Sequence, residues 1–139
     1  MEYQLASADI ARALDVLAGD HERIARALAQ VGYPQERRRD HSFATLARII
    51  VGQQVSVAAA TSITRRLVDT LDGDLCADSV LKCPDEDLRG AGLSRQKVSY
   101  MRSLATAEAS GQLSLPSLPE LPDDEAVATI TAIKGFGEW

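Results

Sequence analysis

The sequence is poor in aromatic residues, has two cysteines and contains no long apolar run. No stretch approaches the roughly 20 apolar residues that cross a bilayer, and the amino terminus lacks the basic start and apolar stretch of a secretory signal. We therefore expect no membrane association and a cytoplasmic location. Cys76 and Cys83 have the spacing of neither a Cys-x-x-Cys redox motif nor a zinc pair, so we predict that both are reduced and structural.

The chain also lacks an excess of positive charge. Its 139 residues carry 15 Lys and Arg against 20 Asp and Glu, for a net charge of −5. The charges are nevertheless sorted into blocks, because residues 37–66 hold six basic side chains and one acid, and residues 89–102 hold four bases and no acid. This pattern is typical of a protein with a locally positive face. It is also compatible with an ordinary solvated surface of mixed charge.

A chain of this length buries enough surface to hold a core without metals or disulfides. Apolar residues recur with the period of a helix, most clearly at positions 43, 46, 47, 50 and 51. These positions form one stripe of a core-facing helix. Since no segment shows the alternation of a convincing strand, the sequence predicts an all-α fold.

Further helices are expected where a capping residue precedes an apolar stripe. Ser7, Ser56 and Ser94 are predicted N-caps, and Asp123 with Asp124 suits the start of the last helix. Residues 113–122, with three prolines, are expected to form an extended linker. In the last helix we expect the inward-facing side chains to be Val127, Ile130 and Ile133.

The carboxyl end carries the most informative pattern, an apolar helix that runs into Lys134-Gly135-Phe136-Gly137. Two glycines one residue apart permit positive φ or a close approach of the backbone, so the chain can reverse and present bare N–H groups to a phosphate. Taken alone, a Gly-x-Gly after a helix is more often an ordinary turn. As a helix-hairpin-helix it would bind DNA phosphates while carrying little sequence information. No predicted strand precedes it, which disfavours a dinucleotide-binding fingerprint.

Three blocks in the same order point to a known family. They are residues 43–56, which end in Ile-Ile-Val-Gly-Gln-Gln-Val-Ser, residues 92–97 (Gly-Leu-Ser-Arg-Gln-Lys), and residues 133–139 (Ile-Lys-Gly-Phe-Gly-Glu-Trp). On these blocks the chain resembles the helix-hairpin-helix DNA glycosylase superfamily, and within it the DNA-3-methyladenine glycosylase II (alkylbase DNA glycosylase) family. The resemblance implies a helical bundle of that type, truncated at its carboxyl end. Residues 42–139 would form the domain that ends in the first half of the hairpin, and residues 1–41 would be helices that pack with the missing carboxyl-terminal part.

The resemblance also implies an activity. Members of the family hydrolyse the N-glycosidic bond of alkylated purines such as 3-methyladenine, which opens base-excision repair. The expected partner is double-stranded DNA that contains damaged bases, in a nucleoid-associated setting, and no obligate protein partner is expected. The chemistry is consistent, because a damaged base leaves the stack more cheaply than an intact one and an alkylated purine carries a positive charge that an aromatic wall attracts.

Site residues follow from the resemblance by position. DNA-binding roles fall on Gln53, Gln54, Lys134, Gly135 and Gly137, and the wall of the substrate pocket falls on Trp139. A monovalent cation, Na⁺ or K⁺, would be held by the backbone carbonyls of Thr131, Ile133 and Phe136; no other cofactor is expected. The structural alternatives remain open, since both glutamines could simply cap the helix junction and a lone Trp is usually a core residue.

The catalytic aspartate of the family lies beyond the position of residue 139, and no acid within the chain is a credible replacement. His21 and His41 are expected to be surface or capping residues. We therefore expect the chain to be part of a longer glycosylase and to be inactive by itself. The alternative is a non-catalytic helix-hairpin-helix module that only binds the DNA backbone.

Overall fold

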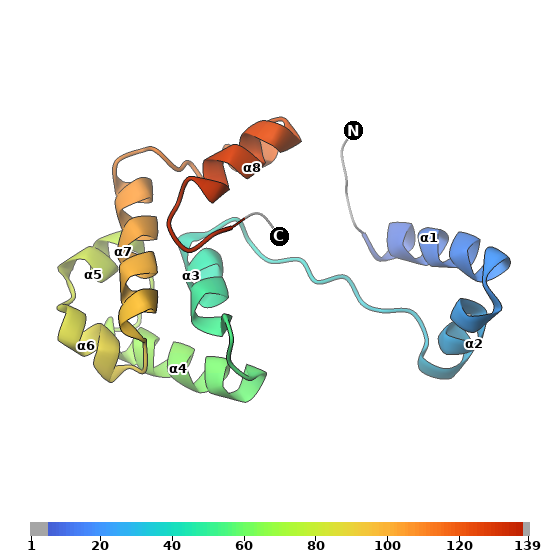
Figure 1. Ribbon diagram of the computed structural model, residues 1–139, viewed down its shortest axis with the longest axis horizontal. Helices are drawn as coiled ribbons and strands as arrows, with labels where there is room; N and C mark the ends of the chain where they lie inside the picture. Colours follow the sequence, from blue (N-terminus) through green and yellow to red (C-terminus); the bar gives the residue numbers. More distant parts are fainter. Residues whose placement is uncertain (1–5, 138–139) are drawn as a thin grey trace. The chain divides into compact units, whose positions relative to one another are not determined.

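The computed structural model describes residues 6–137 and divides the chain into two compact units, Met1–Arg39 and Asp40–Trp139. We refer to them as the amino-terminal unit and the main unit (Figure 1). No helix among the described residues is long and apolar enough to cross a bilayer.

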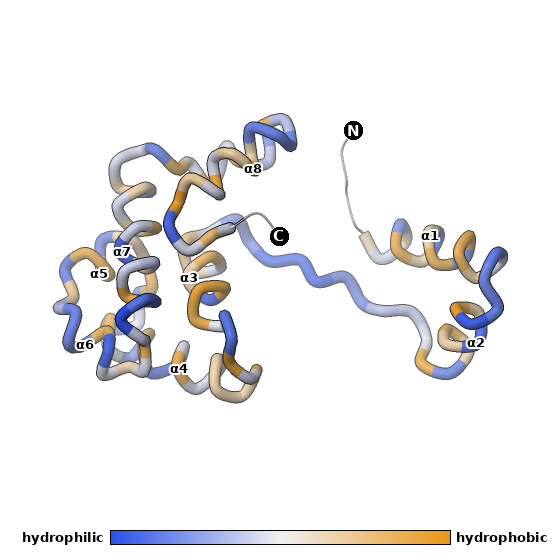
Figure 2. The backbone as a smooth tube through the Cα atoms, in the orientation of Figure 1, coloured by the Kyte–Doolittle hydropathy of each residue, from blue (hydrophilic) through white to orange (hydrophobic). Residues whose placement is uncertain are grey.

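The amino-terminal unit is a pair of packed helices, α1 (Ser7–Asp20) and α2 (Glu22–Val31). The prediction that Ser7 caps α1 is wrong, because Ala6 occupies the N-cap and Ser7 is the first helical residue. Ser7 is instead tied to the following connector: its backbone N–H donates to the carboxylate of Glu36 at 2.8 Å. The connector after Gly32 has no regular secondary structure and stands out as hydrophilic in Figure 2.

The described residues of the main unit form helices joined by turns, with no strand among them, which confirms the all-α prediction. Its elements are α3 (Phe43–Gly52), α4 (Val57–Thr70), α5 (Ala77–Lys82), α6 (Asp85–Gly90), α7 (Arg95–Ala109), the 3₁₀ turn η1 (Leu118–Glu120) and α8 (Asp123–Thr131). Two predicted caps are confirmed, since the side chain of Ser56 accepts the N–H of Ala59 and that of Ser94 accepts the N–H of Lys97.

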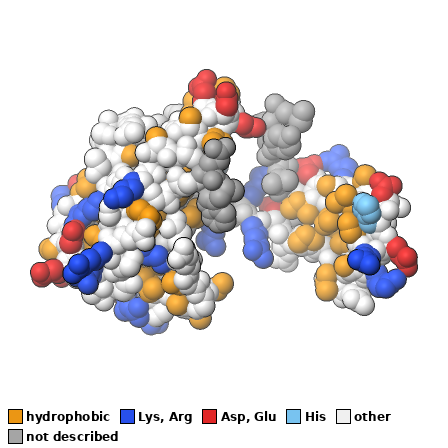
Figure 3. Space-filling model, in the orientation of Figure 1, with side chains coloured by type: hydrophobic (Ala, Val, Ile, Leu, Met, Phe, Trp, Pro, Cys, Tyr) orange, Lys and Arg blue, Asp and Glu red, His pale blue; other side chains and the backbone are white. Residues whose placement is uncertain are grey.

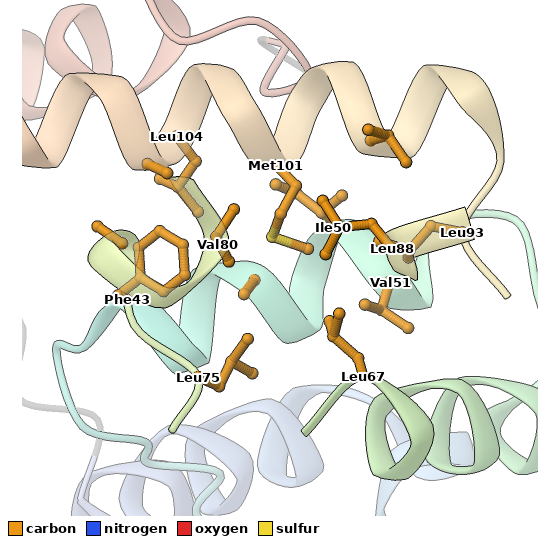
Figure 4. Close-up of a cluster of buried hydrophobic side chains, with 14 of the residues drawn as sticks. Phe43, Ile50, Val51, Leu67, Leu75, Val80, Leu88, Leu93, Met101 and Leu104 are labelled. Atoms are coloured by element: carbon orange, nitrogen blue, oxygen red, sulfur yellow. The ribbon is translucent and has the colours of Figure 1, made fainter. Parts of the chain in front are cut away.

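The core lies where α7 packs against α3 and α5. Met101 and Leu104 of α7, Ile50 of α3 and Leu67 of α4 belong to one hydrophobic cluster, and all four side chains are fully buried (Figure 4). The apolar stripe predicted in residues 43–51 is confirmed, because four of its positions are buried: Phe43, Ala47, Ile50 and Val51.

The connection from α7 to α8 differs from its prediction. Residues 113–122 are not an extended linker; they form turns and η1, and Leu113 and Leu115 are buried in the core. Helix α7 ends at Ala109, before the first of these prolines, and Leu113 and Leu115 reach the core in the segment between them. Their burial stabilises the compact path.

The last helix also differs in detail. Pro122 occupies the N-cap of α8 without a side-chain hydrogen bond, so Asp123 and Asp124 lie in the first turn, where their charge still opposes the helix dipole. Ile133 is buried as predicted, whereas Val127 is 48% exposed, so the prediction that Val127 faces inward is wrong.

Candidate nucleic-acid interface

The chain reverses directly after α8 at residues 133–136. The N–H of Phe136 donates to the carbonyl of Ile133 at 3.1 Å, which closes a four-residue turn. Gly135 is the third residue of this turn and has a φ of +102°. A positive φ at that position is the feature that selects glycine in type II turns. The predicted reversal at the first glycine is therefore present.

Gly135 is also held in close contact with helix α7. A Cβ atom built on this glycine would lie 2.6 Å from Cδ2 and 2.8 Å from Cβ of Tyr100. The Tyr100 hydroxyl accepts a hydrogen bond from Gln96 Nε2 at 2.5 Å, which fixes the ring. Position 135 therefore requires glycine for two separate reasons, its backbone conformation and the space taken by Tyr100.

Lys134 lies against the same helix. Its backbone N–H donates to Ser103 Oγ at 3.3 Å, and its Nζ donates to Ser99 Oγ at 2.9 Å. The side chain is exposed, so the ammonium group stays in contact with solvent while a hydroxyl holds it in place. Lys134 therefore places a positive charge beside the hairpin, and the hydroxyl group of Ser99 holds this charge along α7.

The polar groups of the hairpin backbone are only partly used within the protein. Among residues 6–137, the N–H groups of Gly135 and Gly137 donate to no other group. In the same described part, the carbonyls of Thr131 and Phe136 accept no hydrogen bond, while that of Ile133 accepts the N–H of Phe136. The bend thus offers both free donors and free carbonyl oxygens.

A second segment, the turn between α3 and α4, lies beside the hairpin. The side-chain amide of Gln53 donates from Nε2 to the carbonyl of Gly135 at 2.9 Å. Gln54 is exposed and has a φ of +54°, which is rare for a residue with a side chain. At the start of α7, Lys97 Nζ donates to the carbonyl of Val51 at 2.7 Å, and burial lowers the pKa of this amine.

These two segments and α7 line an open cleft of about 820 Å³. Its walls are Gln53, Gln54, Tyr100, Thr131, Ala132, Ile133, Lys134, Gly135, Phe136 and Gly137. The structure therefore brings together all the predicted site residues except Trp139, which lies outside the described residues. Lys134 is the charged residue in this described lining, and no carboxylate belongs to it. The cleft is suited to an anion.

The sequence analysis missed the part of the site that α7 contributes. Gln96, Ser99, Tyr100 and Ser103 follow one another at helical spacing, on a face of α7 that does not carry the buried Met101 and Leu104. This polar stripe was visible in the sequence. Only the fold shows that the hairpin lies against it.

The apolar side chains of the hairpin are covered within the main unit. Ile133 is 2% exposed and belongs to the core, and Phe136 is half-buried against that core. Ile130 is also half-buried. The hairpin is therefore anchored by apolar contacts within the main unit.

The comparison with protein families defines the class. Residues 47–133 match the model of the HhH-GPD superfamily base excision DNA repair protein. This match covers more than half of the chain, so the chain belongs to the HhH-GPD superfamily of base excision DNA repair proteins, and the family resemblance seen in the sequence is confirmed.

More particular relatives are DNA-3-methyladenine glycosylases. The chain is 28% identical over 99 residues to YfjP of Bacillus subtilis, whose name assigns it to this class, and the match covers 66% of the chain and 34% of YfjP. It superposes on the DNA-3-methyladenine glycosidase of Bacillus halodurans with a TM-score of 0.73 and 29% identity, over 87% of this chain and 56% of that one.

A second solved structure is the 3-methyladenine DNA glycosylase of Schizosaccharomyces pombe in complex with abasic DNA. The TM-score is 0.80 and the identity 26%, over 92% of this chain and 65% of that one. The chain therefore spans about a third of the length of YfjP and between half and two thirds of the two solved chains.

Proposed function

We propose that the main unit binds the phosphate backbone of damaged double-stranded DNA through the hairpin, as part of a glycosylase that removes alkylated purines such as 3-methyladenine. The observation that carries this proposal is the cleft in which unpaired hairpin N–H groups lie beside the Gln53–Gln54 turn. The names of the relatives support the reaction, and the complex of the Schizosaccharomyces pombe relative with abasic DNA supports the partner.

In this proposal the N–H groups of Gly135 and Gly137 donate to phosphate oxygens, and Lys134 adds a positive charge beside them. Backbone donors carry no sequence information. A repair protein needs this property, because damage arises in any sequence. The net charge of −5 does not oppose such binding, since the described cleft is lined by a lysine and no acid.

Gln54 is the residue that we propose enters the DNA stack. An extruded nucleotide leaves a gap, and filling that gap offsets part of the cost of unstacking. Gln54 is exposed at the tip of the turn and held at positive φ, a conformation that costs about 1–2 kcal/mol for a residue with a Cβ. Strain of this kind gathers at functional sites.

A monovalent cation fits the free carbonyls of the bend. Such ions take oxygen ligands, and the carbonyls of Thr131 and Phe136 accept no hydrogen bond among the described residues, while Ile133 has a second lone pair available. We propose that these three carbonyls hold Na⁺ or K⁺ when DNA binds. The ion would supply positive charge between the carbonyl oxygens and a phosphate.

The substrate base is proposed to stack on Trp139, and the catalytic aspartate is proposed to lie beyond residue 139. The described lining of the cleft contains no carboxylate that would serve instead. The same observation favours a second candidate function, a module that binds the DNA backbone without catalysis. Under either proposal the 139-residue chain binds DNA and releases no base.

The amino-terminal unit has an apolar groove of about 440 Å³ between its own helices, lined largely by Leu14, Ile24, Leu28 and Val31. Neither α1 nor α2 has a buried residue, and hydrophobic side chains gather on the face of this unit seen in Figure 3. We propose that this face packs against protein carboxyl-terminal to residue 139, as the family resemblance implies.

Two measurements test the proposed function. Fluorescence anisotropy with a labelled duplex that contains a stable abasic analogue should show binding that weakens steeply between 50 and 200 mM salt, because each phosphate contact releases counterions. Absent or salt-insensitive binding contradicts the proposal. Incubation of the chain with methylated DNA should release no 3-methyladenine, and release of the base would show that the catalytic group lies within residues 1–139.

A further inference from the structure

The side chain of Gln53 joins two segments that lie 82 positions apart in the chain. Its Nε2 donates to the carbonyl of Gly135 at 2.9 Å, and the residue is half-buried. Among the described residues, this is the hydrogen bond that connects the turn after α3 with the hairpin after α8. The acceptor is a backbone carbonyl, so the bond acts on the path of the main chain at the bend.

The other hydrogen bonds that fix the hairpin from outside come from α7. Ser99 accepts from the Lys134 ammonium and Ser103 accepts from the Lys134 N–H, while the Tyr100 ring packs under Gly135. These contacts hold the hairpin on α7. Gln53 adds the hydrogen bond that joins the hairpin directly to the turn after α3.

The turn itself is anchored separately. Lys97 Nζ donates to the carbonyl of Val51 at 2.7 Å, which ties the end of α3 to the first turn of α7. The C-cap residue Gln53 follows this anchor, and the strained Gln54 comes next. The amide of Gln53 is therefore already engaged inside the protein, whereas the side chain of Gln54 is exposed.

We propose that Gln53 is a positioning residue: its amide holds the phosphate-binding hairpin at a fixed distance from the residue that enters the stack, and it does not read a base. This inference rests on the proposed function and deepens it. The bases and phosphates of a duplex lie at fixed distances from one another. A site that binds both must therefore hold its own two parts at a matching distance. Loss of the bond would loosen the hairpin and weaken its phosphate contacts.

The test compares adjacent glutamines. Gln53→Met removes the donor and keeps the length of the side chain, and Gln54→Met makes the same chemical change one residue later. Gln53→Glu is a second variant that keeps the shape but offers only acceptors to the Gly135 carbonyl. The exchange rate of the Phe136 amide proton, measured without DNA, reports on the closed bend, and the salt dependence of binding to an abasic duplex reports on phosphate contacts.

Gln53→Met and Gln53→Glu should both speed exchange of the Phe136 amide about fivefold to tenfold, as expected for the loss of one ordinary hydrogen bond that supports the bend. Gln53→Met should also reduce the magnitude of the slope of log affinity against log salt by about 1, the value that corresponds to one phosphate contact. Gln54→Met should weaken binding to the abasic duplex while leaving the exchange rate and the slope unchanged.

The inference is overturned if Gln53→Met weakens binding but leaves both the exchange rate and the slope at their original values, because Gln53 would then contact DNA directly. It is also overturned if Gln54→Met speeds the exchange equally. Failure of the unaltered chain to bind any duplex would instead remove the proposed function. The two failures are distinguishable, because the exchange measurement needs no DNA.

Discussion

Replacement of Gly135 by alanine is the sharpest test of how the hairpin is built. The methyl group of Gly135→Ala would sit within 2.8 Å of the Tyr100 side chain, and the backbone would keep a φ of +102°. The colliding atoms of Tyr100 include its Cβ, so the ring cannot swing away without moving its own helix. We therefore expect the substitution to destabilise the main unit and to displace the bend.

The two penalties can be worked out separately. A residue with a Cβ at positive φ costs about 1–2 kcal/mol, and an extra methyl group forced into a packed contact costs about 1–3 kcal/mol. The expected total for Gly135→Ala is about 2–5 kcal/mol. Since a typical domain is stable by about 5–15 kcal/mol, this is a large fraction of the stability.

Gly73→Ala is the matched control. Gly73 has a φ of +89°, but a Cβ built on it meets nothing within 4 Å, so only the backbone penalty applies. Urea unfolding followed by helical circular dichroism should show Gly135→Ala to be less stable than Gly73→Ala by about 1–3 kcal/mol. A shortening of Tyr100 to alanine removes the colliding ring atoms and leaves the Cβ, so it should narrow this difference without abolishing it. Equal stability of the two glycine variants would refute the contact between the hairpin and α7.

Three further predictions concern the main unit. Burial raises the pKa of Glu108 near the end of α7, so its ionised form opposes folding above that pKa and the penalty disappears as the pH falls below the ordinary value of 4.5. In urea titrations Glu108→Gln should therefore be more stable than the unaltered chain at pH 7 and equally stable at acid pH. Lys97→Met should lose about 1 kcal/mol with the bond to Val51, whereas Arg95→Met in the same turn should lose less, and equal losses would show that the bond contributes nothing. Leu113→Ala should cost about 2–5 kcal/mol by thermal melting, and a loss under 1 kcal/mol would be inconsistent with its burial.

The sequence predicted those features that depend on residues close together in the chain. The stripe that begins at Phe43, the caps at Ser56 and Ser94 and the reversal at Gly135 all follow from local spacing and from the properties of single residues. Each of these is decided within one or two helical turns. For this reason they could be identified before the fold was known.

Features that depend on distant segments could not be predicted in this way. The burial of Leu113 and Leu115 depends on the space left between helices, which the prolines around them do not reveal. The engagement of Ser7 by Glu36, the contact of Tyr100 with Gly135 and the bond from Gln53 to that glycine join positions 29 or more apart. The sequence named both glutamines as site residues, but only the fold separates their environments.

The central claim is that the backbone N–H groups of the hairpin bind a DNA phosphate. The most direct measurement is a titration of the ¹⁵N-labelled chain with an abasic duplex, followed by amide shifts in NMR spectra at two salt concentrations. The largest shifts should fall on Gly135 and Gly137 and should shrink at the higher salt. Binding of the duplex with these two amides unmoved, and with shifts confined to a region such as the arginines at 37–39, would contradict the account.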